Sequence, residues 1–297
     1  MEFDAAPDLE VAAVHLGLGD DQRPRHLSPS SSTLYQQCPR KWRYRYVDRL
    51  PDPPGEAALV GTFAHLVLEH LLQLPAGQRS QEAAKRLARA HWPEIETDPD
   101  FVALGLGEPE SKAFRWKAWL AVSGLWALED PDATEVHATE HEVQVELTGV
   151  PFRGIVDRID VLDGELVISD YKSGKAPAER FRHRPLKQVL LYAAAVRAGT
   201  GQRPLGARLL YLGQRSMGVR VTEQNLEQVT AELADTWQSL TADADTDDFA
   251  TSTGPLCAWC PFLSACADGQ AEVRSRHAAG NVRADAPGLA VIYAEAG

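Results

Sequence analysis

Two aspartates and a lysine stand at or near the ends of two short apolar runs. Asp157 follows Ile155 and Val156, and Asp170 follows the run "LVIS", with Lys172 two positions later. Burying a carboxylate costs free energy unless it is paired or holds a metal ion. Carboxylate ligands suit Mg²⁺ or Mn²⁺. A lysine on the same strand face as Asp170 can orient water or offset the charge of a transition state.

These residues need two paired strands to bring them together. The stretches "FRGIVDRIDVL" (152–162) and "ELVISDYK" (165–172) read as strands, and Asp163-Gly164 between them is typical of a hairpin turn. A hairpin folds Asp157 and Asp170 toward the same end of the sheet. Asp160 is expected at the edge of its strand and Asp163 in the turn, both without a chemical role.

The rest of the chain predicts a mixed α/β fold, with helices before a hairpin-rich sheet. The segment 27–47 begins as a serine-rich helix. Apolar periodicity predicts helices over 61–74, 81–92, 111–129, 184–198 and 223–240, and strands over 137–147, 207–212 and 218–222. We expect the domain to cover 28–268, with a flexible tail over 1–27 and a C-terminal tail over 269–297.

Composition places limits on function. The 297 residues are 44% hydrophobic and 24% charged, as in soluble globular proteins. The sequence has no apolar run near the ~20 residues of a membrane span and no signal-peptide pattern at its start, so we expect a cytoplasmic protein with no membrane partner. A net charge of -12 argues against a surface that coats itself with nucleic acid. The lack of a GxxxxGK[ST] loop argues against a nucleotide-driven motor.

The four cysteines form one pattern. Cys38 stands alone near the start, and Cys257, Cys260 and Cys266 follow as C-x2-C-x5-C. In a cytoplasmic chain this spacing favours a metal site over disulfides. Four thiolates suit either zinc or an iron–sulfur cluster, and the longer second gap favours a cluster modestly. Either metal would link two distant parts of the chain and stabilise the fold.

The segment "PRKWRYRY" (39–46) combines cations with aromatic residues. Its cations suit phosphate contacts, and its aromatic rings suit base stacking. The alternative is that Trp42, Tyr44 and Tyr46 pack beneath the metal site. The sequence does not decide whether these three rings stack on bases or pack beneath the metal site. The predicted DNA contacts are Arg40, Lys41, Arg43 and Arg45.

The stretch "GIVDRID…ISDYKSG" closely resembles the core of the PD-(D/E)XK nuclease superfamily, in its RecB-like exonuclease branch. "GTFAHLVLEH" resembles the upstream helix of that branch, and this resemblance implies that His65 is a metal ligand. "KQVLLYAAAV" resembles its QxxxY helix, with matches at Gln188 and Tyr192. Glu69, one turn after His65, could support the metal. The cysteine layout is similar to that of the iron–sulfur members, including the Cas4 and AddB types, and implies a 4Fe–4S cluster.

The resemblance spans roughly 28–268 and implies a restriction-endonuclease-like mixed sheet flanked by helices, with an N-terminal helical part and a C-terminal cysteine clasp. It implies a metal-dependent DNA exonuclease that acts on single strands or ends in repair or recombination. Mg²⁺ or Mn²⁺ would be held by His65, Asp157, Asp170 and the backbone carbonyl of Tyr171, with Lys172, Gln188 and Tyr192 completing the catalytic group.

Two alternatives stay open. The first is a Cas4-type processing nuclease or the nuclease partner of a separate helicase. The second is an iron–sulfur DNA-binding module without turnover, against which the intact Asp157, Asp170 and Lys172 weigh.

Overall fold

The computed structural model describes residues 18–294. Most of the tail predicted over 1–27 therefore lies outside the described residues. Its last part is not a simple tail, because the side chains of Leu18 and Leu27 are buried and Leu27 forms a β-bridge with Phe152.

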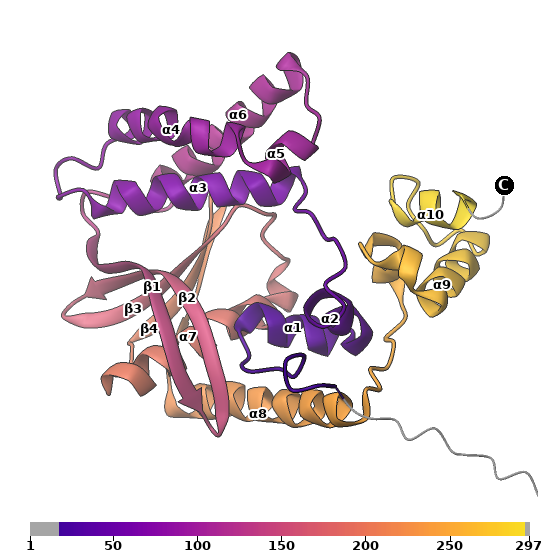
Figure 1. Cartoon of the computed structure of the whole chain (residues 1–297). Helices are drawn as coiled ribbons and strands as arrows, with labels where there is room; N and C mark the ends of the chain where they lie inside the picture. Colours follow the sequence, from indigo (N-terminus) through magenta and orange to yellow (C-terminus); the bar gives the residue numbers. More distant parts are fainter. Residues whose placement is uncertain (1–17, 295–297) are drawn as a thin grey trace, which may run out of the picture. The chain divides into compact units, whose positions relative to one another are not determined.

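A five-stranded mixed sheet forms the centre of the fold (Figure 1). Its strands lie in the order β1 (Glu135–Leu147), β2 (Val150–Leu162), β3 (Glu165–Lys172), β4 (Gly206–Tyr211) and β5 (Arg215–Arg220). Only β3 and β4 are parallel. Parallel neighbours need a crossover, and the helix α7 (His183–Thr200) supplies it. The mixed α/β prediction is confirmed.

Tight turns fix the register of the first three strands. Asp163 and Gly164 both have positive φ, 52° and 81°, as a two-residue hairpin turn requires. Thr148 and Gly149 between β1 and β2 do the same, at 53° and 79°. The Asp163-Gly164 turn pairs Leu162 with Glu165. The Asp163-Gly164 turn explains why β2 and β3 could be placed from sequence.

A group of helices packs on one another and on the sheet. It comprises α3 (Glu56–Gln73), α4 (Gln81–Glu96), α5 (Pro99–Ala103) and α6 (Glu108–Ser123). α3 is apolar around much of its surface, and its buried Phe63, Val67 and Leu71 share a core with Phe114 of α6. Tyr171 and Leu210 of the sheet join the same core. This packing holds α3 beside the sheet.

The chain divides into two compact units. Residues 25–36 and 50–237 form the unit that contains the sheet. The described residues of 1–24, 37–49 and 238–297 form the other. Two helices continue from one unit into the other along the chain, α1 (Pro29–Gln37) and α8 (Glu223–Thr246).

The second unit contains all four cysteines. It holds α2 (Pro39–Tyr46), the short 3-10 helices η3 (Pro255–Trp259) and η4 (Leu263–Ala265), α9 (Ala267–Ala278) and α10 (Gly288–Ala294). Much of the tail predicted over 269–297 is thus helical. Val273 of α9 and Ile292 of α10 are buried with Ala258 and Leu263 of the cysteine segment, which gives this short stretch its own small core.

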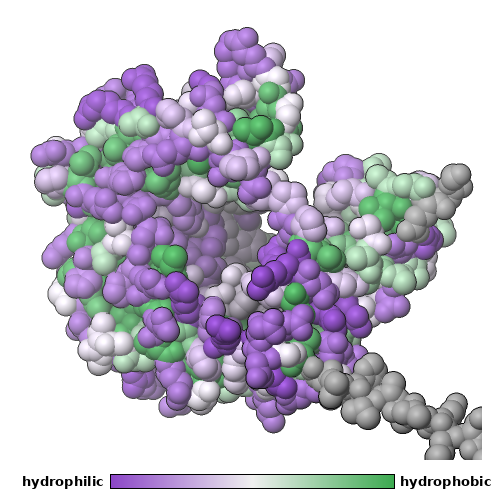
Figure 2. Space-filling view, viewed as in Figure 1, coloured by the Kyte–Doolittle hydropathy of each residue, from purple (hydrophilic) through white to green (hydrophobic). Residues whose placement is uncertain are grey.

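The visible surface mixes hydrophilic and hydrophobic side chains (Figure 2). Among the described residues, no helix combines the length and apolar character needed to cross a membrane.

Candidate active site

Asp157 and Asp170 come together at one end of the β2–β3 hairpin. The last paired residues there are Arg158 and Ser169, and one further step brings the two aspartates opposite each other. Asp157 Oδ2 accepts the backbone N–H of Tyr171 at 2.8 Å. The side chain of Asp157 is 12% exposed and that of Asp170 is 1% exposed. The convergence predicted from the hairpin is therefore present.

His65 projects from α3 onto this pair. Its Nε2 lies 3.2 Å from the carbonyl oxygen of Tyr171, and its Nδ1 lies 3.4 Å from Asp157 Oδ2. These two contacts use different ring nitrogens, and one ion can bind only one nitrogen of an imidazole. His65 would therefore offer either Nε2 or Nδ1 to a Mg²⁺ or Mn²⁺ ion beside Asp157.

Glu140 of β1 is a further member that the sequence did not reveal. One ligand atom from each of His65, Glu140 and Asp157 lies within 4.8 Å of the other two. The backbone of Glu140 has φ of 44°, a left-handed conformation that costs a residue with a side chain about 1–3 kcal/mol. In the strand "HATEHEVQVEL" nothing distinguished Glu140 from Glu142 or Glu146.

The electrostatics of the group favour a cation. Burial raises the pKa of Glu140 to about 7, and the nearby carboxylates of Asp157 and Glu69 add to the shift. Burial and then Asp157 raise the pKa of Asp170 to about 6, against the opposing effect of Lys172. Burial is the largest cause of both pKa shifts, and the smaller contributions from neighbouring carboxylates show that negative charges lie close together here. A divalent cation offsets such charge, and one imidazole with several oxygens is a fitting donor set.

Lys172 and Gln188 hold Asp170 from two sides. Lys172 Nζ lies 2.6 Å from Asp170 Oδ2 and donates to Gln188 Oε1 at 3.0 Å. Gln188 Nε2 donates to Asp170 Oδ1 at 2.8 Å. Gln188 comes from α7, so the crossover helix orients a residue of β3. The three side chains form a closed arrangement with a defined geometry.

Tyr192 lies one turn further along α7, and its position explains a glycine. A Cβ atom at Gly154 of β2 would lie 2.7 Å from Tyr192 Cε1. Burial, followed by the charge of Asp170, raises the pKa of the Tyr192 hydroxyl. Gly154 therefore lets the Tyr192 ring approach the sheet closely.

The site opens into a pocket of about 530 Å³. Among its lining residues are Gly61, His65, Glu69, Glu140, Lys172 and Ser173. Gly61 matters for the same reason as Gly154, because a Cβ there would lie 2.8 Å from Ser173 Oγ. Glu69 lines this pocket, and its carboxylate accepts a hydrogen bond from Gln73 at 3.2 Å.

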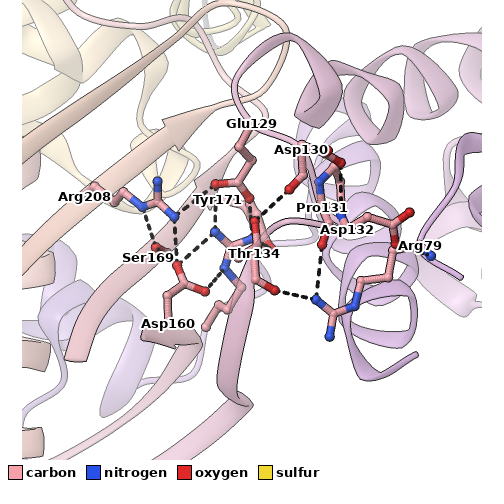
Figure 3. Close-up of polar contacts among 11 residues, drawn as sticks. Arg79, Glu129, Asp130, Pro131, Asp132, Thr134, Asp160, Ser169, Tyr171 and Arg208 are labelled. Atoms are coloured by element: carbon pink, nitrogen blue, oxygen red, sulfur yellow. Dashed lines mark hydrogen bonds and ion pairs between the residues drawn. The ribbon is translucent and has the colours of Figure 1, made fainter. Parts of the chain in front are cut away.

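A buried charge network lies on the opposite face of β2 and β3 (Figure 3). Arg158, with a fully buried side chain, donates to Glu129 at 2.6 Å, to Asp160 and to the Tyr171 hydroxyl at 2.8 Å. Arg208 of β4 also pairs with Asp160, at 2.8 Å. The prediction that Asp160 lies at the edge of its strand was wrong, because its side chain is 5% exposed and pairs with both arginines. These contacts are structural, and the expectation that Asp160 has no chemical role stays a prediction.

Tyr171 connects this network with the candidate metal site. Its hydroxyl accepts a hydrogen bond from Arg158, while its backbone N–H donates to Asp157 and its carbonyl oxygen lies 3.2 Å from His65 Nε2. Successive side chains of a strand alternate between faces, which is why Arg158 and Asp157 point to opposite sides. The network thereby supports the strand segment that carries the site.

The four cysteines line one pocket of about 240 Å³ in the second unit. Backbone N–H groups donate to Cys38, Cys257 and Cys266 at 3.3–3.4 Å, from Ser252, Gly254 and Gly269. Cys260 accepts one from Phe262. Burial raises the pKa of the Cys257 and Cys260 thiols. Such donors around every sulfur fit thiolate ligands of a metal centre.

The predicted DNA-contact segment forms α2 and makes several contacts within its own unit. Arg43 pairs with Asp48 at 3.3 Å and with Asp247, and Arg40 donates to the carbonyl of Phe249 at 2.7 Å. Lys41 lies at the cysteine pocket. A DNA role for Arg40, Lys41, Arg43 and Arg45 stays a prediction.

The rings of this segment divide between the two alternatives. Trp42 is buried and stacks on Phe249, with ring centroids 5.9 Å apart. Tyr44 donates its hydroxyl to the carbonyl of Ala265 at 2.8 Å. These contacts favour packing for both, whereas Tyr46 is 40% exposed.

Comparison with known proteins places the chain among nucleases. Residues 26–267 match the PD-(D/E)XK nuclease superfamily. The chain is 27% identical over 194 residues to the Gene 69 protein of Mycobacterium phage D29. The aligned region covers 57% of this chain and 68% of the phage protein. It is 26% identical over 211 residues to the Gene 69 protein of Mycobacterium phage L5. That aligned region covers 57% of this chain and 69% of the phage protein.

A solved structure from Eubacterium rectale, named "Putative exonuclease", is 13% identical and has a TM-score of 0.39, over 76% of this chain and 84% of that one.

Proposed function

We propose that this chain, which belongs to the PD-(D/E)XK nuclease superfamily, is a metal-dependent DNA exonuclease acting on single strands or DNA ends. One observation supports this most directly: donor atoms of His65, Glu140 and Asp157 lie within 4.8 Å of one another, beside the Asp170–Lys172 pair. Superfamily membership supports a nuclease. The metal, the substrate form and the role in repair or recombination belong to the proposal.

Each residue has a distinct proposed role. His65, Glu140, Asp157, Asp170 and the carbonyl of Tyr171 would hold Mg²⁺ or Mn²⁺. When bound, such an ion activates water and offsets charge on a phosphodiester. Lys172 is a donor only, so it would orient the attacking water and offset charge on the scissile phosphate. Gln188 positions Lys172 and Asp170 through its two hydrogen bonds.

The cysteine pocket supports a 4Fe–4S cluster as a second cofactor. Zinc–sulfur bonds of 2.3 Å in a tetrahedron put the sulfurs about 3.8 Å apart. Across residues 18–294, no three cysteine sulfurs gather within 4.8 Å of one another. This wider spacing favours a cluster, whose irons spread the four ligands, over a single zinc.

A nuclease assay tests the proposal. Anaerobically purified protein would be incubated with end-labelled single-stranded, blunt and overhanging DNA, with Mg²⁺, Mn²⁺ or chelator. We expect metal-dependent shortening from an end, lost in Asp170→Ala protein prepared in parallel. Cleavage that persists in chelator would contradict metal dependence. Cutting of a circular single strand as fast as a linear one would make the protein an endonuclease instead.

A further inference from the structure

A second pocket, of about 550 Å³, lies between α4 and α6 over α3. Its lining includes three tryptophans and three cations, namely Trp92, Trp116, Trp119, Lys85, Arg89 and Arg115. Its residue from α3 is Phe63, two positions before His65. Residues two apart on a helix point about 200° apart, so this pocket and the candidate active site use different faces of α3.

Helical spacing puts these groups on facing surfaces. Lys85, Arg89 and Trp92 are four and three residues apart on α4, so they share one face. Arg115 and Trp119 are four apart on α6, with Trp116 beside them. The pocket therefore consists of two helix faces that carry the same combination of rings and positive charge.

The tryptophans offer both a fixed surface and an open one. Trp92 is held edge-on by Phe63 and Phe101, with ring centroids 5.9 and 5.5 Å apart, and Arg115 lies 4.3 Å above its ring. Trp116 has a residue exposure of 60%. The exposed ring of Trp116 is a suitable surface for a flat ligand, whereas Arg115 already covers one face of Trp92.

The charge in the pocket is positive. No carboxylate is among its lining residues. Two cations have carboxylate neighbours outside the lining, Glu82 at 2.7 Å from Lys85 and Glu96 at 2.9 Å from Arg115. Within residues 18–294, Arg89 makes no hydrogen bond or ion pair, and it is exposed. Surface pairs of this kind contribute little free energy and release their cations readily.

We infer that this pocket binds single-stranded DNA, with a base stacked on Trp116 and phosphates near Arg89 and Lys85. The inference rests on the proposed nuclease function. Rings give a stacking surface for any base, and cations give the backbone contact, which is the combination that single strands require. Paired bases in a duplex cannot reach the rings. An acidic or proline-rich protein segment is the competing occupant.

Fluorescence anisotropy with labelled oligo(dT) tests the inference. The parent for binding is the Lys172→Ala chain in chelator, so that DNA stays intact. In this background Trp116→Ala with Arg89→Ala should lower affinity for oligo(dT) about tenfold or more, and should hardly change affinity for a blunt duplex. Arg89→Ala alone should also reduce the salt dependence of binding.

Matched controls lie on the same helices outside the pocket lining. Leu120 of α6 is 50% exposed, and Arg86 of α4 is exposed. Leu120→Ala with Arg86→Ala should bind oligo(dT) within about twofold of the parent. Thermal unfolding of both double variants shows whether the fold is retained.

Three outcomes overturn the inference. Equal affinity of the two double variants for oligo(dT) would show that the pocket does not bind DNA, while cleavage by the wild-type chain would leave the nuclease function standing. An equal loss of affinity for duplex and for single-stranded DNA would show that the contact depends on charge alone. If the wild-type chain neither binds nor cuts DNA, the proposed function itself fails.

Discussion

The ammonium of Lys172 lies 2.6 Å from the carboxylate of Asp170, on the same face of β3. The two groups differ in what they can do, although they touch. Asp170 can bind a cation, whereas Lys172 would repel one. Their contact therefore gives a way to separate metal binding from bond cleavage.

Changing Lys172 should impair cleavage and spare metal binding. Lys172→Ala should lower the cleavage rate by about a hundredfold or more, because it removes a group that offsets transition-state charge. Mn²⁺ binding by calorimetry should stay the same or tighten. The Asp170→Ala variant should lose both DNA cleavage and Mn²⁺ binding at this site. If Lys172→Ala and Asp170→Ala cut DNA at the parent rate with Mn²⁺, β3 does not carry the active site.

Glu140→Gln should weaken metal binding without weakening the fold. The carboxylate is half-buried among other carboxylates, so its replacement removes repulsion in the metal-free protein and should leave unfolding by urea unchanged or raise its midpoint. Cleavage should require more Mg²⁺ for half-maximal rate. The control is Glu142→Gln on the same strand, where the carboxylate is exposed and pairs with Arg153. An identical Mg²⁺ requirement in both variants would remove Glu140 from the ligand set.

Arg158→Met should destabilise the protein by about 3–5 kcal/mol, because it leaves Asp160 and Glu129 buried with less compensation. Urea unfolding measures this. Arg153→Met, on the same strand but with a 56% exposed side chain, should cost less than about 1 kcal/mol. Similar unfolding midpoints for the two variants would show that the network in Figure 3 contributes little.

Cys257→Ser should remove the metal of the second unit. We expect the parent to purify brown under anaerobic conditions with about four irons per chain, and the variant to be colourless with a lower melting temperature. Ser264→Ala, in the same segment, should keep its iron. Analysis that finds one zinc and negligible iron in the parent would replace the cluster with a zinc site.

The local pattern of the sequence determined the strands, the turns and the placement of two carboxylates. Period-two alternation and the Asp163-Gly164 turn act over neighbouring residues, so β2, β3 and the convergence of Asp157 with Asp170 could be predicted. Resemblance to a nuclease family added His65 and Gln188, whose contacts with Tyr171, Asp157 and Asp170 the structure then supplied.

Only the tertiary structure revealed Glu140, the role of Asp160 and the aromatic pocket. Glu140 looks like any strand glutamate until the left-handed backbone and the packing of β1 beside β2 bring it to Asp157. Asp160 becomes buried because Arg158 and Arg208, from two different strands, neutralise it. The tryptophans of α4 and α6 are distant in sequence. Such relationships depend on contacts between elements, and no local pattern encodes them.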